Sequence, residues 1–125
     1  MNIGFLGCGN IAQAMIVGLL DSGLKPGSIT VLTRNQKKKK FYEKNSIKSL
    51  AVSKANSAKF DFIFLCVKPK DVKNAIEGSK INWENTTLVS VVAGISSQKL
   101  KVFSNSEKVI RIMPTTSAEF GKSIT

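Results

Sequence analysis

A glycine-rich hexapeptide near the start of the chain is the clearest chemical signal in the sequence. It reads Gly7-Cys8-Gly9-Asn10-Ile11-Ala12, a G-x-G-x-x-A pattern that follows an apolar run and opens an amphipathic stretch. In this setting Gly7 permits a tight turn, Gly9 lets the backbone approach a pyrophosphate, and Ala12 allows close contact between helix and strand. The free N–H groups and the dipole of a helix N-terminus bind diphosphates. We therefore expect this segment to bind a dinucleotide through Leu6, Gly7, Cys8, Gly9, Asn10, Ile11 and Ala12; the alternative is a turn that binds nothing.

The end of the second apolar run indicates which dinucleotide would bind. A cofactor with a free ribose 2′-hydroxyl is usually held there by Asp or Glu, but this chain has Thr33-Arg34-Asn35, followed by lysines at 37–40. A carboxylate would repel a 2′-phosphate, whereas the Arg34 guanidinium would attract it. The sequence therefore favours NADP(H) over NAD(H), with Thr33 and Arg34 in the site. The alternative is an exposed loop arginine without a ligand.

Three further segments are expected beside the same ligand, because open α/β sheets bind ligands outside the carboxyl ends of their strands. Small residues and prolines in these segments leave room for a flat nicotinamide. Lys68 could hold a phosphate or ribose oxygen, or it could be an exposed turn lysine. The segments are Cys66-Val67-Lys68-Pro69, Val92-Ala93-Gly94 and Met113-Pro114-Thr115.

The elements that must position these residues follow from an alternation of short apolar runs and longer amphipathic stretches. The run at 62–67 is apolar throughout, which predicts a strand buried on both faces. Strands separated by helices require right-handed crossovers and a parallel sheet. We therefore predict an α/β, doubly wound, mainly parallel Rossmann-type sheet of about six strands with helices on both faces. The predicted strands are 3–6, 29–33, 49–52, 62–67, 87–92 and 109–113; the predicted helices are 36–45, 54–59, 71–76, 97–104 and a first one with Ile11, Ala14, Met15, Gly18 and Leu19 on its buried face.

Length and composition exclude several classes of protein. The 125 residues suit one domain, and 42% apolar with 22% charged residues is inconsistent with a disordered chain. No apolar run is long enough to span a membrane, and no basic segment precedes the first apolar run as in a signal peptide, so we expect a cytoplasmic location. The chain has no histidine, which excludes histidine-based catalysis or zinc binding within it. The two cysteines, Cys8 and Cys66, are expected to be small buried hydrophobes, and no metal site is expected.

The formal net charge of +11 raises the possibility of a nucleic-acid or anionic ligand. The excess is almost entirely lysine, with Arg34 and Arg111 as the arginines. Specific base recognition usually relies on Arg, Asn and Gln at one recognition element, and none is evident. The lysines at 37–40 are read as a solvated helical face or as an aid to attracting a phosphorylated ligand. Nucleic acid is therefore an unlikely partner.

Four ordered segments of the chain together resemble one family, the pyrroline-5-carboxylate reductases that make proline. Members of that family typically show V-K-P-Q, S-x-x-A-G-I and R-x-M-P-N-T after the glycine motif. This chain departs from those patterns at Lys70 and Thr115, which affects the substrate side more than the cofactor side. The matching segments are residues 3–14 with Gly18-Leu19, Val67-Lys68-Pro69-Lys70, Ser90-Val91-Val92-Ala93-Gly94-Ile95 and Arg111-Ile112-Met113-Pro114-Thr115-Thr116.

The resemblance implies an NADP-binding Rossmann domain over residues 1–125 and hydride transfer from NADPH to the C=N carbon of 1-pyrroline-5-carboxylate. It implies that Met113, Pro114 and Thr115 border the nicotinamide and the imine, and that Ser53 contacts a ribose. No catalytic residue is assigned. Family members continue into a C-terminal helical domain that dimerises and completes the substrate site. The chain is therefore expected to be the cofactor half, to turn over poorly alone, and to be a homodimer only with that second domain.

Two alternatives stay open at this point. One is another imine-reducing or deazaflavin-linked NADP oxidoreductase built on the same cofactor domain. The other is a non-catalytic nucleotide- or nucleic-acid-binding module, which the charge of +11 suggests. Substrate screening separates the first from a pyrroline-5-carboxylate reductase, and salt-dependent retention on DNA or RNA would support the second.

Overall fold

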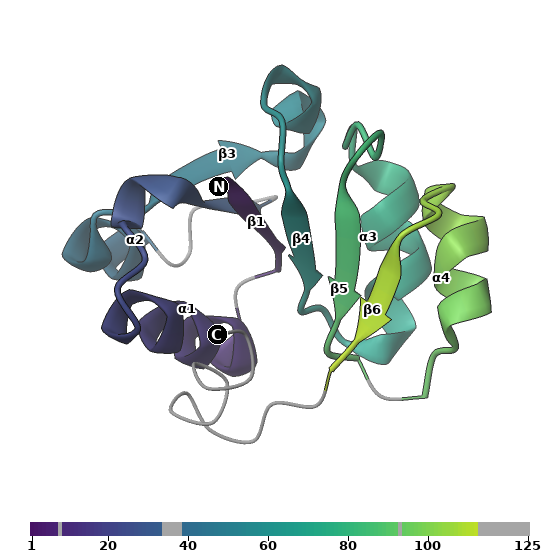
Figure 1. The fold of residues 1–125 in the computed structure, drawn as a ribbon, viewed down its shortest axis with the longest axis horizontal. Coiled ribbons are helices and arrows are strands. Elements are labelled where there is room, and N and C mark those ends of the chain that lie inside the picture. Colours follow the sequence, from purple (N-terminus) through teal and green to yellow (C-terminus); the bar gives the residue numbers. More distant parts are fainter. Residues whose placement is uncertain (8, 34–38, 93, 113–125) are drawn as a thin grey trace.

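The computed structural model describes residues 1–7, 9–33, 39–92 and 94–112 and contains one six-stranded sheet (Figure 1). Every neighbouring pair of strands is parallel, and the order across the sheet is β3-β2-β1-β4-β5-β6. This order is typical of doubly wound dinucleotide-binding folds. The strands are β1 (Ile3–Leu6), β2 (Ile29–Thr33), β3 (Lys48–Ala51), β4 (Phe62–Leu65), β5 (Thr87–Ser90) and β6 (Val109–Arg111).

The first strand lies in the middle of the sheet. β1 pairs with β2 on one side and with β4 on the other, with Ile3 opposite both Ile29 and Phe62. All four residues of β1 are buried. Successive side chains of a strand point to opposite faces, so Phe5 packs in one apolar cluster and Leu6 in the other.

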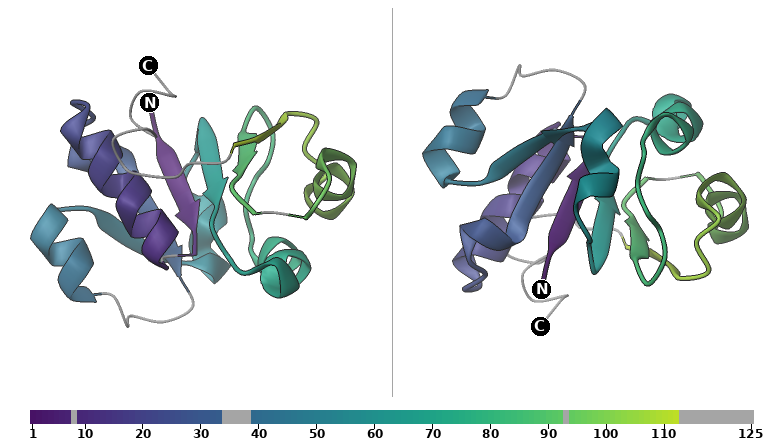
Figure 2. Two further views of the ribbon diagram at one scale, coloured as in Figure 1. Left: turned by 90° about the horizontal axis from the view of Figure 1, so that it is seen from below. Right: turned by 90° about the horizontal axis from the view of Figure 1, so that it is seen from above.

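Helices cover both faces of the sheet. α1 and α2 lie towards the β1–β2–β3 half of the molecule, and α3 and α4 lie beside β5 and β6 (Figures 1 and 2). Residues of α1 and α2, such as Met15 and Tyr42, pack in the cluster of Phe5, whereas Val72 of α3 and Leu100 of α4 pack in the cluster of Leu6. The helices are α1 (Asn10–Asp21), α2 (Lys39–Asn45), α3 (Val72–Gly78) and α4 (Ser97–Ser104), with 3-10 turns η1 (Pro26–Ser28), η2 (Val52–Ser57) and η3 (Pro69–Asp71).

The fold class expected from the sequence is confirmed: a parallel, doubly wound sheet of six strands with helices on both faces. Several boundaries differ by a few residues. The strand expected at 62–67 ends at Leu65, although the Cys66 N–H still donates to the Leu6 carbonyl oxygen at 3.0 Å. The short helix expected at 54–59 is the 3-10 segment η2, which begins directly after β3 and buries Ala55.

The buried face of α1 was predicted incorrectly at two positions. Ile11 is 54% exposed and Ala14 is also exposed, whereas Ala12 and Ile16 are fully buried. The reason is that Ala12 packs directly against the sheet, which rotates the helix so that positions 12, 15, 16 and 19 face the core. Cys66 also differs from expectation, because it is half-buried at the margin of this cluster rather than fully enclosed.

No helix in the described ranges is both long and apolar enough to cross a membrane.

Candidate functional site

The parallel sheet brings the predicted ligand-binding segments to one edge. The carboxyl ends of parallel strands share an edge, and the arrowheads of β4, β5 and β6 point the same way in Figure 1. Leu6 and Gly7 therefore lie at the same edge as Thr33 at the end of β2 and Cys66 after β4. Val92 follows β5 there as well.

Gly7 occupies a backbone position that only glycine adopts easily. Its φ is +98°, in the region that L side chains rarely enter. A Cβ at Gly7 would lie 2.9 Å from Cγ1 of Val67 and 3.0 Å from the Cys66 carbonyl oxygen. The Gly7 N–H donates to the Leu32 carbonyl oxygen at 3.5 Å. The turn after β1 is thus held between the ends of β2 and β4.

Gly9 differs from Gly7, because its backbone conformation is one that any residue can adopt. It is the N-cap of α1 with φ −81° and ψ −167°, and its carbonyl oxygen accepts the Gln13 N–H at 3.0 Å. Among the described residues, no heavy atom lies within 4 Å of the position that a Cβ would take at Gly9. The backbone at Gly9 therefore borders open space that a ligand can enter.

The start of α1 offers unsatisfied amide donors to that space. The first N–H groups of a helix have no intrahelical acceptor, and in the described structure no side chain caps α1. Asn10 and Ile11, the first two helical residues, are exposed and carry no negative charge. An anionic group can therefore bind here through backbone N–H groups and the helix dipole.

A pocket of about 300 Å³ adjoins the glycine turn, and we call it the carboxyl-edge pocket. It lies between the ends of β1 and β2, the start of η2, the loop after β4 and the start of α3. Its volume is at the lower end of the range of small-molecule sites. The lining residues are Leu6, Gly7, Leu32, Thr33, Val52, Val67, Asp71, Asn74 and Ala75.

Four of these nine lining residues were predicted from the sequence as ligand-binding residues, and five were not. Leu6, Gly7, Thr33 and Val67 were expected. Leu32 and Val52 were missed although they lie next to strand ends. Asp71, the N-cap of the crossover helix α3, and Asn74 and Ala75 within it were missed; their spacing of three and four residues is the signal that places them on one helix face.

The loop after β5 is shaped by a buried serine. The Ser90 hydroxyl accepts the Val92 N–H at 3.1 Å, and the Ser90 carbonyl oxygen accepts the Ile112 N–H at 2.9 Å. The Val92 side chain packs in the apolar cluster of Leu6, so a ligand would meet its backbone. Gly94 has φ +79°, which favours glycine.

Other predicted residues lie at the same edge but outside the lining of the carboxyl-edge pocket. Ala12 is fully buried, which agrees with a role in helix–strand contact rather than in direct ligand binding. Ser53 is exposed in η2, next to Val52. Lys68 and Pro69 are exposed where η3 begins. Six predicted residues lie outside the described residues: Cys8, Arg34, Ala93, Met113, Pro114 and Thr115.

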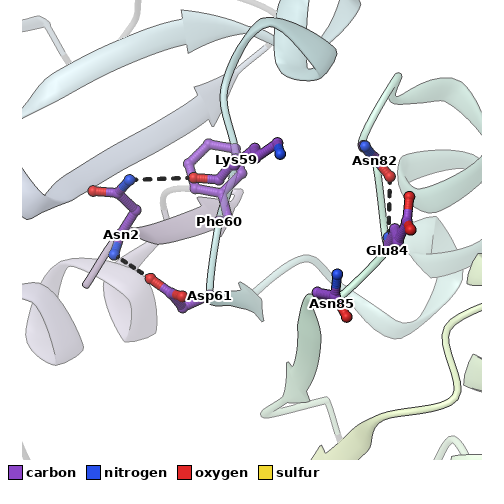
Figure 3. Close-up of a pocket in the computed structure, with 7 residues that line it drawn as sticks. All are labelled: Asn2, Lys59, Phe60, Asp61, Asn82, Glu84 and Asn85. Carbon is purple, nitrogen blue, oxygen red and sulfur yellow. Dashed lines mark hydrogen bonds between the residues drawn. The ribbon is translucent and has the colours of Figure 1, made fainter.

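A second pocket, of about 250 Å³, lies at the opposite, amino edge of the sheet (Figure 3). There the Asn2 backbone N–H donates to the Asp61 carboxylate at 2.7 Å, and the Asn2 side-chain amide donates to the Lys59 carbonyl oxygen at 3.3 Å. These bonds join the start of β1 to the segment before β4. Within the described ranges, no group of three or more Cys, Asp or Glu side chains is placed to hold a metal ion.

The comparison with protein families gives one match that covers most of the chain. The family model described as NADP oxidoreductase coenzyme F420-dependent matches residues 2–94. This range includes the glycine turn, the whole carboxyl-edge pocket and the first residues of the loop after β5.

Curated relatives and solved structures agree on a narrower similarity. The chain is 32% identical over 122 residues to pyrroline-5-carboxylate reductase from Haemophilus influenzae, covering 96% of this chain and 45% of that protein. It is 34% identical over 127 residues to pyrroline-5-carboxylate reductase 2 from Bacillus subtilis, covering 98% of this chain and 46% of that protein. The structure of a pyrroline-5-carboxylate reductase from Coxiella burnetii matches with a TM-score of 0.77 and 27% identity, over 94% of this chain and 46% of that one.

These similarities confirm the resemblance to pyrroline-5-carboxylate reductases that the four sequence segments indicated. The chain spans less than half the length of these relatives. The fold also matches Plasmodium falciparum pyrroline carboxylate reductase, solved with NADP bound, with a TM-score of 0.76 and 20% identity over 92% of this chain and 42% of that one.

Proposed function

This chain belongs to the family described as NADP oxidoreductase coenzyme F420-dependent, and we propose that it binds NADP(H) at the carboxyl edge of its sheet. The observation that carries the proposal is the contrast between the two glycines of the first turn. Gly7 is held against the loop after β4, whereas Gly9 borders open space at the uncapped start of α1. We place a diphosphate in this open space beside Gly9. A Cβ at residue 9 would occupy part of the same space.

The roles of individual residues follow from this placement. The amides of Gly9, Asn10 and Ile11 would hold the diphosphate, and Leu6 and Gly7 would form the floor below it. The adenosine half would occupy the carboxyl-edge pocket, with its ribose near Thr33. Arg34 beside the 2′-phosphate and Ser53 beside a ribose belong to the same proposal. Ala12 belongs to the site through its contact between helix and strand, which positions the glycine turn. The full proposed set is Leu6, Gly7, Cys8, Gly9, Asn10, Ile11, Ala12, Thr33, Arg34, Ser53, Cys66, Val67, Lys68, Pro69, Val92, Ala93 and Gly94.

The proposed reaction is the reduction of 1-pyrroline-5-carboxylate to proline. When bound, NADPH supplies a hydride to the C=N carbon, and a proton on the nitrogen completes the product. Such a reaction requires the protein mainly to position its two reactants. We place Met113, Pro114 and Thr115 at the substrate side, by their match to the family motif. The similarity to pyrroline-5-carboxylate reductases over nearly the whole chain supports this substrate.

Residues 1–125 are proposed to act as the cofactor-binding part of such an enzyme. Because they align with less than half of each relative, we expect part of the substrate contacts to come from outside them. The chain should therefore bind NADPH and reduce 1-pyrroline-5-carboxylate slowly. A cytoplasmic location, and a homodimer formed only with a further helical domain, stay predictions.

The experiment that tests the proposal is a fluorescence titration of the chain with NADPH and, separately, with NADH. We expect saturable binding of NADPH and weaker binding of NADH, with Arg34→Ala removing most of the difference. Failure to bind either nucleotide would overturn the proposal. Equal binding of both would refute the role of Arg34 alone.

A second candidate function rests on the description of the matching family model, which names coenzyme F420, a deazaflavin. In this case hydride would pass between NADP and the deazaflavin rather than to an imine. An assay with each acceptor separates the two functions. NADPH oxidation that depends on a deazaflavin, with 1-pyrroline-5-carboxylate inert, would favour the second.

A further inference from the structure

Asp71 is an exposed residue that lines the carboxyl-edge pocket. It is the N-cap residue of α3, where an aspartate commonly accepts a backbone N–H of the first turn. In the described structure the Asp71 side chain accepts no such capping bond. Its backbone N–H donates to the Lys68 carbonyl oxygen at 2.9 Å, which fixes the residue at the end of η3. The backbone of Asp71 is therefore fixed, while its carboxylate makes no capping bond and can accept a hydrogen bond from a ligand.

The remaining lining of the carboxyl-edge pocket combines apolar and polar residues. Val52, Val67 and Ala75 line it from η2, the loop after β4 and α3, and Thr33 and Asn74 are the polar side chains among the other lining residues. Such a lining suits a flat heteroaromatic ring, with polar groups at its edge. An ionised carboxylate can only accept hydrogen bonds. A ring that fits this pocket must therefore present a donor to Asp71.

We infer that Asp71 recognises the exocyclic amino group of the adenine ring and makes the site selective for adenine among purines. The inference rests on the proposed function, because it requires the adenosine half of NADP(H) to enter this pocket. The amino group at purine position 6 offers two N–H donors. Hypoxanthine carries a carbonyl oxygen at the same position, and two acceptors facing each other repel. Its N1–H lies on the neighbouring ring atom, so the ring would have to turn to offer that donor.

The test compares NADPH with its deaminated analogue, reduced nicotinamide hypoxanthine dinucleotide phosphate. Both carry the same nicotinamide, so one fluorescence titration serves for both. For the native chain we expect NADPH to bind about tenfold more tightly than the analogue, as for one hydrogen bond to a charged group at an exposed site. For Asp71→Asn we expect a ratio close to one, because an amide can accept from an amino group or donate to a carbonyl oxygen.

Asp61→Asn is the matched control. It changes the net charge by the same amount, but Asp61 lies at the amino edge of the sheet, bonded to Asn2 (Figure 3). Either substitution can strengthen the binding of an anionic ligand in general, and this general effect cancels in the ratio of the two affinities. The control should therefore keep the native ratio. Improved binding of the analogue to Asp71→Asn, relative to NADPH, cannot arise from unfolding.

Two results would overturn the inference while leaving the proposed function intact. One is a native chain that binds NADPH and the analogue equally well. The other is an Asp71→Asn variant that keeps the native ratio, as expected if Asp71 only stabilises the start of α3. A native chain that binds neither nucleotide would instead refute the proposed function, and the inference with it.

Discussion

Replacing Gly9 by alanine should separate the binding of the cofactor from the stability of the fold. The backbone at Gly9 is extended, and no described heavy atom lies within 4 Å of the added Cβ. Alanine is a poorer N-cap than glycine, but it also lowers the entropy of the unfolded chain, so the free energy of unfolding should change by only about 0.5 kcal/mol. The methyl group would stand where the diphosphate approaches. An overpacking cost of about 1–3 kcal/mol corresponds to a loss of NADPH affinity of roughly 5- to 150-fold.

Gly7→Ala, in contrast, should lower the stability of the fold, because the added Cβ meets Val67 and the backbone of Cys66. A side chain at φ +98° costs about 1–2 kcal/mol. The contacts at 2.9 and 3.0 Å add about 1–3 kcal/mol. For a chain of this length the sum lowers Tm by roughly 8–20 °C. Affinity for NADPH should fall as well, since the turn itself is displaced.

Urea denaturation and thermal unfolding followed by circular dichroism measure the stability of both variants, and NADPH fluorescence measures binding. Gly27→Ala is the control: Gly27 lies in η1 and, among described atoms, its Cβ would also meet nothing within 4 Å. It should match the native chain in both assays. A Gly9→Ala variant that binds NADPH like the native chain would show that no diphosphate lies over Gly9, and the placement of the cofactor would be wrong.

Four further substitutions test contacts that stabilise the fold, each through the free energy of unfolding in urea. Thr86→Val should cost about 1–2 kcal/mol, because the Thr86 hydroxyl, 2% exposed, donates to the Phe60 carbonyl oxygen at 2.6 Å; an unchanged midpoint would argue against that bond. Leu100→Ala should cost about 2–5 kcal/mol, since Leu100 is fully buried between α4 and the sheet; a loss below this range would indicate that the site collapses. Ser96→Ala should cost about 1 kcal/mol, because the Ser96 hydroxyl accepts the Lys99 N–H at the start of α4. Ser46→Gly should stabilise the chain by roughly 0.5–1 kcal/mol, since exposed Ser46 has φ +58°, and destabilisation would contradict the strain at that residue.

The approximate positions of the strands and the glycine turn could be predicted from local sequence, because each depends on residues close together in the chain. Apolar runs set the strands, and the G-x-G-x-x-A pattern sets the turn into α1. The buried face of α1 could not be predicted in the same way. Residues 11, 14, 15 and 18 form as regular an apolar stripe as 12, 15, 16 and 19, and only the contact of Ala12 with the sheet decides between them.

The residues that line the carboxyl-edge pocket from η2 and from positions 71–75 could not be predicted from local sequence either. Asp71 was expected to open a helix, but which side chains of α3 face the pocket depends on how the crossover from β4 sets the rotation of a seven-residue helix. Val52 lines the pocket because η2 turns directly after β3, where a later short helix was expected. These positions depend on packing between segments distant in the chain, which no local pattern reports.

The central position of β1 has a consequence for how the chain acquires its structure during synthesis. β1 is synthesised before both of the strands that it pairs with, and the later of these, β4, ends only at Leu65. Until then β1 has an unpaired strand edge, a template for association with other chains. The sheet can then extend outwards, as β5 and β6 add in chain order on one side. Pairings this far apart in sequence slow folding, so the nascent first half depends most on protection from aggregation.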